Sequence, residues 1–285
     1  MGNFDGVHLG HASVIDAARG RGRLGVVTCE PHPRQVFVPD TPAFRLMNAG
    51  ARANRLAKLG VDTLYELPFD RALSDLTPEG FVSHVLHRGL GVGHVVVGAD
   101  FCFGRGRSGT AADLQALGAQ HGIGVTVAPL LAQGDAPVSS TAIRRALTEG
   151  DPRAAAAMLG HWHRIEGEVM HGEKRGRSLG YPTANMALAD LHLPRFGVYA
   201  VWADVLTGPR AGSYRGAASL GVRPMFGENT PNLETHLLDF EGDLYGQILS
   251  VALVEYLRPE LRLDGLPALI AQMDADCARV RDILT

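Results

Sequence analysis

The sequence predicts two domains of different fold class: an amino-terminal α/β domain with a parallel sheet, and a carboxyl-terminal antiparallel β-barrel closed by a helix. A length of 285 residues suits about two domains of roughly 150 residues each. Short β-branched apolar runs alternate with amphipathic stretches in the first half, whereas strands separated by turn residues fill the second half. These observations place the domains at residues 1–158 and 159–285.

Four apolar runs in the first half predict the parallel strands, at residues 24–28, 62–67, 94–98 and 124–128. Helix-like stretches at 13–19, 51–59, 78–90 and 111–121 provide crossover connections of suitable length. A helical pair at 140–147 and 152–159 ends the domain, because Gly150 and Pro152 are helix stop and start signals.

The second half predicts antiparallel strands at residues 164–170, 197–205, 214–220, 234–240 and 248–257. From Leu266 to Leu284, apolar residues recur at helical spacing and form one stripe. Such a stripe is typical of core packing, so we expect a final helix that closes the barrel.

Composition excludes several classes of partner. Lys and Arg number 27 against 30 Asp and Glu, a net charge of −3 that does not favour nucleic acid. No uncharged apolar run approaches the roughly 20 residues of a membrane span, so no membrane partner is expected. Cys29, Cys102 and Cys277 are odd in number and far apart, which excludes a disulfide framework or zinc knuckle. With no export signal in the opening residues, the sequence predicts a cytoplasmic protein, of open oligomeric state.

The opening motif, GNFDGVHLGH at residues 2–11, places two histidines three apart among glycines just before a helix. One helical turn puts His8 and His11 on one face. The glycines let a phosphate approach the backbone, while the helix N-terminus and the imidazoles supply donors. We interpret the motif as a phosphate site. A surface turn or half of a zinc site are the alternatives, although the spacing is not that of a zinc protease and no third ligand is evident.

A second motif, SSTAIR at residues 139–144, places hydroxyls at a helix start with an arginine one turn later. Taken alone, ordinary helix capping and a solvated arginine explain it. Together, the two motifs resemble those of the nucleotidyltransferases that join a nucleoside monophosphate to a small acceptor. That resemblance implies a Rossmann-like domain in which the second motif closes over the phosphates of the nucleotide.

Two further segments follow predicted strands, EPHPR at residues 30–34 and GADFCFG at residues 98–104. Ligands of α/β proteins bind at the carboxyl ends of strands, although a turn with a buried aromatic explains either segment alone. Combined with the first two motifs, they resemble the adenylyltransferase half of the bacterial bifunctional riboflavin kinase/FAD synthetase family. The resemblance implies that Asp100 and Phe101 contact the flavin or a ribose.

The second half carries GEKRGRSLGYPTAN at residues 172–185. Thr183 and Asn185 share a face of an extended segment, and such oxygen ligands suit a magnesium ion that bridges ATP phosphates. A β-turn with an Asx interaction from Asn185 is the alternative. The PTAN segment resembles the riboflavin kinase signature, which implies that the preceding loop contacts ATP through Gly172, Gly176, Arg177 and Gly180.

Glu234, His236 and Leu238 project from one face of a predicted strand. A strand carboxylate is usually just solvated. Beside a bound flavin, however, Glu234 can accept the ribityl hydroxyl proton as that hydroxyl attacks the γ-phosphate, and the resemblance to riboflavin kinases implies this base role.

The resemblance covers nearly the whole chain and implies two Mg²⁺-dependent transfers from ATP. The barrel phosphorylates riboflavin to FMN, with Glu234 as base and Thr183 and Asn185 as metal ligands. The first domain adenylylates FMN to FAD and releases pyrophosphate, with His8 and His11 stabilising phosphate charge rather than acting as nucleophiles. Its implied ATP contacts are Gly2, Phe4, Asp5, Gly10, Ser139, Ser140, Thr141 and Arg144.

Family members usually carry an apolar strand before the GNFDG motif, whereas this sequence opens at the motif. We therefore expect the sheet to lack a central strand and the adenylyltransferase to be the more vulnerable activity. One alternative function is transfer of AMP or CMP to another acceptor, which the PTAN barrel argues against. The other is a flavin-binding protein, or a riboflavin kinase whose first domain is inactive.

Overall fold

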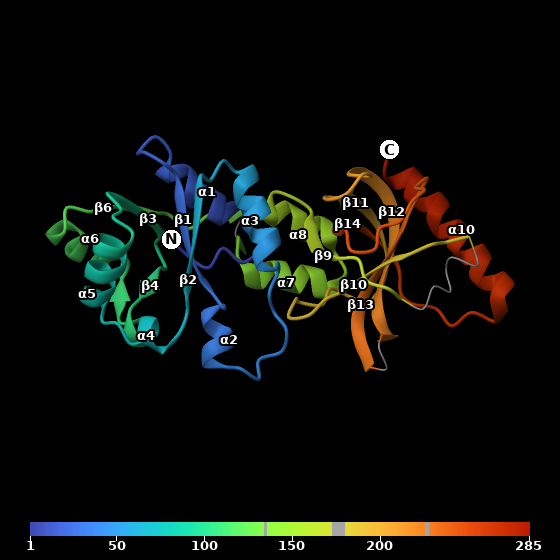
Figure 1. Ribbon diagram of the computed structural model, residues 1–285, viewed down its shortest axis with the longest axis horizontal. Helices are drawn as coiled ribbons and strands as arrows, with labels where there is room; N and C mark the ends of the chain where they lie inside the picture. Colours follow the sequence, from blue (N-terminus) through green and yellow to red (C-terminus); the bar gives the residue numbers. More distant parts are fainter. Residues whose placement is uncertain (134–135, 173–179, 226–227) are drawn as a thin grey trace. The chain divides into compact units, whose positions relative to one another are not determined.

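The computed structural model describes residues 1–133, 136–172, 180–225 and 228–285, drawn as a ribbon in Figure 1. The chain forms two compact units. The first comprises Met1–Pro42 and Arg52–Ser139, and the second comprises Ala43–Ala51 and Ser140–Thr285. Helices α7 (Ser140–Glu149) and α8 (Pro152–Leu159) therefore belong to the second unit by packing, together with the barrel.

The first unit contains the predicted parallel pairings. Strand β1 (Gly25–Glu30) pairs with β2 (Thr63–Pro68), and β3 (His94–Gly98) pairs with β6 (Gly124–Ala128), each in parallel. Within the described part of the chain, no strand joins β1 to β3. The first two residues lie between them instead, because the Met1 amine donates to the Val96 carbonyl at 2.9 Å and the Gly2 amide donates to the Val27 carbonyl at 3.1 Å.

Helices pack against these strands in the predicted order. They are α1 (Leu9–Ala18), α3 (Ala49–Lys58), of which Arg52 onward belongs to this unit, α5 (Pro78–Gly80), the π-helix η1 (Phe81–Gly89) and α6 (Ala111–Gln120). Shorter elements are α2 (Pro33–Phe37), α4 (Arg71–Ser74), β4 (Cys102–Phe103), η2 (Arg105–Arg107), β5 (Gly109–Thr110), β7 (Ala132–Gln133) and β8 (Ala136–Pro137). Helix α1 begins four residues before the predicted start at residue 13, because the His8 side chain caps it.

The second unit is an antiparallel six-stranded sheet. Its strands are β9 (His163–Glu168), β10 (Ala184–Ala187), β11 (Gly197–Val205), β12 (Gly212–Met225), β13 (Glu228–Leu237) and β14 (Ile248–Arg258), in the spatial order β10-β13-β12-β11-β14-β9. An isolated bridge between Met170 and Asn185 connects the two ends of this order. The sheet therefore forms the nearly closed barrel that the sequence predicts. Figure 1 shows α10 (Gly265–Ile283) along its outer side, where Val280 packs with Val198 and Val254.

Two strands differ in extent from the prediction, and a third was not predicted. Strand β12 spans Gly212–Met225, whereas residues 214–220 were predicted. Strand β13 begins at Glu228 and ends at Leu237, whereas residues 234–240 were predicted. Pairing with β12, from Gly216 opposite Leu237 to Met225 opposite Glu228, extends the strand through Pro231 and other turn-type residues. Residues 184–187, which lack a clear alternation, form the unpredicted strand β10 because they pair with β13. Tertiary pairing overrides local propensity at these places.

No helix among the described residues has the length and apolar character needed to cross a membrane. Cys29, Cys102 and Cys277 are free thiols. Burial raises the pKa of the Cys29 thiol to about 11, so this group stays protonated at neutral pH.

Candidate active sites

A tight loop leads from the sheet of the first unit into α1. Phe4 and Val7 have φ values of 50° and 41°, a region that side-chain-bearing residues rarely adopt. Both side chains are fully buried, and the Val7 amide donates to the Phe4 carbonyl at 3.2 Å. Burial of these two side chains holds the backbone in this conformation, so the start of α1 has a fixed position.

The two histidines of this loop form one unit. Their rings stack with centroids 3.7 Å apart and planes 18° apart, which confirms that they share a face. The Nδ1 atom of His8 accepts a hydrogen bond from the His11 backbone amide at 3.3 Å. In the neutral ring the proton therefore resides on Nε2, which becomes a donor for a ligand. A Cβ at Gly10 would lie 3.1 Å from the His8 ring, so glycine permits this close packing.

Both imidazoles are neutral at pH 7. Burial lowers the pKa of His8 to about 4, and the Asp100 carboxylate opposes this shift in part. Burial also lowers the pKa of His11, and the neighbouring His8 adds to the effect. Within the described residues, Nδ1 of His11 is buried without a hydrogen-bond partner. The loop therefore offers neutral N–H donors and a helix N-terminus to an anion, rather than two cations.

Two buried, neutral histidines, His8 and His163, predict that the folded protein becomes less stable as the pH falls. The pKa is about 4 for His8 and about 3 for His163, which is buried in β9 of the second unit, against 6.5 for both when exposed. Because the unfolded chain binds more protons, each histidine lowers the free energy of unfolding by up to about 1.4 kcal/mol per pH unit as pH falls from 6.5 toward its folded pKa. Urea unfolding between pH 7 and 5 measures this slope. His163→Gln should reduce it, and a slope of zero in the unmodified protein would contradict the neutral, buried state.

The segment after β3 places Asp100 close enough to His8 to influence its pKa. Phe101 is half-buried and stacks on Phe103, with ring centroids 5.7 Å apart, within the cluster that contains Phe81. This packing gives Phe101 a structural role. Its contact with a flavin stays a prediction.

The SSTAIR segment lies where the chain passes from one unit to the other. Ser139 ends the first unit, and Ser140, Thr141 and Arg144 lie in the first turns of α7 in the second. The Arg144 Nε donates to the Phe44 carbonyl at 2.6 Å, and the guanidinium lies 5.5 Å from the centre of the Phe44 ring. Arg144 is thus anchored by its own unit, and the nucleotide contacts of this segment stay predictions.

Sequence reasoning missed a buried arginine beside this half of the chain. Arg52 on α3 is 1% exposed and donates to Glu30 at 2.7 Å and to Glu66. Glu30 ends β1 and Glu66 lies near the end of β2, directly in register with Thr28. The signal was present, because acidic residues at the ends of adjacent parallel strands require a cation when they are partly buried.

In the second unit, strand register brings a predicted metal ligand to the predicted base. Asn185 of β10 lies directly opposite Glu234 of β13. Their neighbours Ala184, Met186 and Leu233 point into the barrel core. Because strand side chains alternate, Asn185 and Glu234 share the other face of the sheet.

A third residue, which sequence reasoning left out of the site, connects these two. Asn232 is 1% exposed, and its Nδ2 lies 3.4 Å from Asn185 Oδ1 and 3.5 Å from Glu234 Oε1. Its position two residues before Glu234 on one strand was the available signal, since i and i+2 share a face. The side-chain amide of Asn232 therefore contacts both Asn185 and Glu234.

Gly172, the first residue of the predicted phosphate loop, adjoins Asn185. A Cβ at Gly172 would lie 2.7 Å from Asn185 Nδ2, so only glycine allows this approach. Asn185 Nδ2 also lies 3.4 Å from the Thr183 carbonyl. Gly180 adopts φ +86°, which favours glycine. The remaining predicted loop contacts, Gly176 and Arg177, lie outside the described residues.

Two cavities of the second unit meet at Pro182. One of about 580 Å³ is lined by Thr183, Thr235 and Tyr245 among others, and Thr235 Oγ1 is buried without a partner in the described structure. The other, of about 1040 Å³, is lined by aromatic and polar side chains that include Tyr214 and His236. His236 Nδ1 is 2.9 Å from the Pro182 carbonyl, which fixes the ring at the cavity wall.

Each half of the chain matches a known protein family. The FAD synthetase family model matches residues 1–142, and the riboflavin kinase family model matches residues 159–284. Bifunctional riboflavin kinase/FMN adenylyltransferases of Pseudomonas fluorescens and Escherichia coli K12 are 42% and 38% identical over 287 aligned residues, which cover 99% of this chain and 91% of each relative.

A solved structure described as a macrolide-efflux protein from Streptococcus pneumoniae also resembles the chain. It has a TM-score of 0.84 and 30% identity, over 99% of this chain and 92% of that one. The identity to the curated relatives extends over nearly the full chain, and both catalytic domains are present. The chain belongs to the bifunctional riboflavin kinase/FMN adenylyltransferase family.

Proposed function

We propose that this chain converts riboflavin to FMN in its barrel and FMN to FAD in its first domain, consuming one ATP in each step. The observation that carries the proposal is the register of Asn185 opposite Glu234, in a chain whose halves match both families. The predicted domain limits, 1–158 and 159–285, assign one activity to each domain. We propose further that the enzyme is cytoplasmic and that its partners are small molecules only.

For the kinase step, Glu234 takes the proton of the riboflavin 5′-hydroxyl, whose oxygen attacks the γ-phosphorus while ADP leaves. Thr183 and Asn185 provide neutral oxygen ligands of the kind that Mg²⁺ accepts alongside phosphates. A bound Mg²⁺ would offset charge on the ATP phosphates. Among the described residues, no cluster of three His, Cys, Asp or Glu side chains could hold a metal ion.

The two cavities suggest where each substrate binds. Thr183 lines the smaller one, so we assign the ATP phosphates to it. Tyr181, Tyr214 and Phe240 line the larger one, and aromatic faces suit the planar ring of a flavin. His236 also lines it, two residues from Glu234 on the same strand. In this division the flavin hydroxyl and the γ-phosphate meet where the two cavities adjoin, at Pro182 and Phe240, which line both.

For the second step, a phosphate oxygen of FMN attacks the α-phosphorus of ATP and pyrophosphate leaves. The neutral rings of His8 and His11, with the start of α1, supply hydrogen-bond donors to the phosphates. Because the rings are held by burial and stacking, these donors are positioned before the substrate arrives.

His11→Ala should stop only the adenylyl transfer. Removing a preorganised donor, together with the ring on which His8 stacks, should lower the rate of FAD formation from FMN about a hundredfold or more. Chromatography of flavins after incubation with FMN and ATP measures this. Riboflavin phosphorylation by the same variant, assayed separately with riboflavin and ATP, is the control, and the exposed His87→Ala is the matched variant. An FAD yield near that of the unmodified protein would remove His11 from the mechanism.

Asn232→Asp should impair the kinase step through Glu234. A carboxylate in this buried position lies about as close to Glu234 as the amide does, at 3.5 Å, and raises the pKa of the pair. We expect the acidic limb of the kcat/KM profile for FMN formation to move to higher pH. Asn232→Ala should lower kcat without this displacement. Identical pH profiles for Asn232→Asp and the unmodified enzyme would contradict the bridging role.

A further inference from the structure

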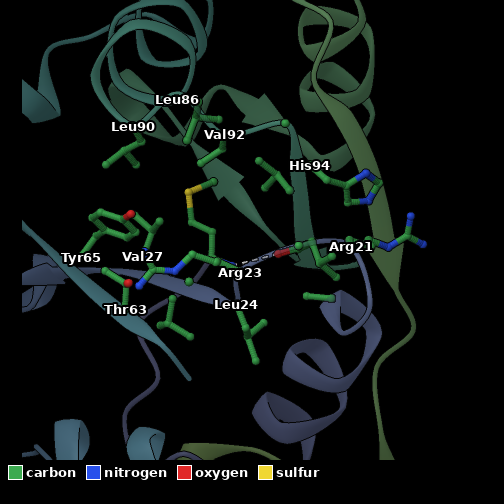
Figure 2. A pocket seen from close by; sticks show the side chains of 18 of the residues that line it. Arg21, Arg23, Leu24, Val27, Thr63, Tyr65, Leu86, Leu90, Val92 and His94 are labelled. Atoms are coloured by element: carbon green, nitrogen blue, oxygen red, sulfur yellow. Dashed lines mark hydrogen bonds between the residues drawn. The ribbon is translucent and has the colours of Figure 1, made fainter. Parts of the chain in front are cut away.

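The cavity of about 340 Å³ in the first unit lies at the amino ends of its parallel strands. Figure 2 shows Thr63 and His94, the first residues of β2 and β3, among the side chains that line it. Ligands of α/β domains bind at the opposite, carboxyl ends of the strands, so we assign no substrate to this cavity. In the second unit, by contrast, Asp274 lines the larger cavity and contacts the segment that leads to Thr183, yet it has no role in the kinase step described above.

Tyr181, Pro182 and Thr183 form part of the boundary between the two cavities of the second unit. Tyr181 lines the larger cavity, Thr183 lines the smaller one, and Pro182 lines both. All three residues lie outside helices and strands, so side-chain contacts must fix their position. Because the residues are consecutive, any contact that fixes Tyr181 also restricts Thr183, the proposed metal ligand.

Strand β13 provides one anchor for this segment. His236 Nδ1 is 2.9 Å from the Pro182 carbonyl, which can only accept, so Nδ1 carries the proton of the ring. The His236 ring also packs edge-on against the Tyr181 ring, with centroids 5.2 Å apart and planes 62° apart. An anchor at one place leaves the segment free to rotate about it, so a second anchor is needed to fix its orientation.

Helix α10 provides the second anchor. One face of this helix lines the larger cavity, through Ile270, Asp274, Cys277 and Arg281. The Tyr181 hydroxyl donates a hydrogen bond to Asp274 Oδ1 on that face. The same hydrogen bond raises the pKa of Tyr181 to about 12, so the hydroxyl stays protonated and remains the donor at neutral pH.

We propose that Asp274 is a positioning residue of the kinase step, which acts through the Tyr181 hydroxyl to fix Thr183 at the ATP phosphates. The role rests on the kinase activity proposed above and on the assignment of ATP to the cavity that Thr183 lines. Asp274 itself takes no part in proton or phosphoryl transfer. Because its carboxylate is exposed, loss of the hydrogen bond should change binding severalfold rather than by orders of magnitude.

Asp274→Ala and Tyr181→Phe test this role, because each removes one partner of the hydrogen bond. Each change should raise the KM for ATP in FMN formation about fivefold. The kcat and the KM for riboflavin should change less than about twofold, since the aromatic ring at position 181 still packs against His236. The double variant should resemble either single variant, because the second change removes nothing further. Initial rates of FMN formation from riboflavin measure these constants.

Two further variants separate positioning from a general structural effect. Asp274→Asn keeps an oxygen that accepts from Tyr181, so its KM for ATP should stay within about twofold of the unmodified value. Asp282→Ala removes another exposed carboxylate of α10 and should leave both KM values unchanged. Additive effects of Asp274→Ala and Tyr181→Phe, or an unchanged KM for ATP in either, would overturn the proposal. A defect in Asp274→Asn equal to that of Asp274→Ala would overturn it as well.

The contact itself can be tested without turnover, by ¹³C NMR of the chain labelled at the tyrosine ring carbon that bears the hydroxyl. The Tyr181 resonance is the one missing in Tyr181→Phe, and it should shift in Asp274→Ala but not in Asp282→Ala. If the unmodified chain forms no FMN, the kinase proposal fails and the positioning role fails with it, whatever the resonance does. If FMN forms and the resonance does not shift, the proposal for Asp274 fails alone.

Discussion

Glu234→Gln should reduce the rate of FMN formation from riboflavin by about two orders of magnitude or more, and leave conversion of FMN to FAD intact. Glutamine keeps the shape of the side chain and its contact with Asn232, but it cannot accept the hydroxyl proton. Separate assays with riboflavin and with FMN as the starting flavin measure the two rates.

The matched control is Glu255→Gln, which removes a carboxylate of the same barrel that pairs with Arg153 at the surface. Its kinase rate should be that of the unmodified enzyme. Loss of both activities in Glu234→Gln, or of neither, would contradict the division of roles between the domains.

Arg52→Met should destabilise the first unit by about 2–3 kcal/mol. Arginine joins Glu30 and Glu66 with a buried guanidinium, and methionine retains its apolar stem but leaves two carboxylates facing each other. Because these carboxylates are 32% and 37% exposed, solvent moderates the loss relative to a fully buried pair. Thermal unfolding should show an earlier transition, with adenylyltransferase activity lost at a lower temperature than kinase activity.

Arg19→Met provides the comparison, because its ion pair with Asp16 is exposed on both sides. That change should cost less than about 1 kcal/mol. Equal effects of the two substitutions would show that the Arg52 pair contributes no more than a surface contact.

Much of the fold follows from the pattern of apolar residues. Strands β3, β6 and β11 coincide with their predicted ranges, because each is a compact apolar run between turn signals. Periodicity reports burial of a segment but not its partner. It therefore could not show that residues 184–187 pair with β13, or that Pro231 continues a strand.

The sequence likewise predicted some features of the candidate sites and not others. The motifs predicted that His8 and His11 share a face, and the stacked rings confirm it. Their neutral state depends on burial by the surrounding fold, which no local motif encodes. Likewise, the sequence predicted Asn185 and Glu234 as separate site residues, whereas their direct opposition and the Asn232 bridge depend on the register of β10 against β13.

The most direct test of the whole account is a time course of flavin products from the purified chain with riboflavin, ATP and Mg²⁺. We predict that FMN appears first and FAD follows, with pyrophosphate released in step with FAD. FMN without FAD would show that the first domain is inactive in this chain. Riboflavin that is bound tightly but never converted would contradict the account and identify a flavin-binding protein.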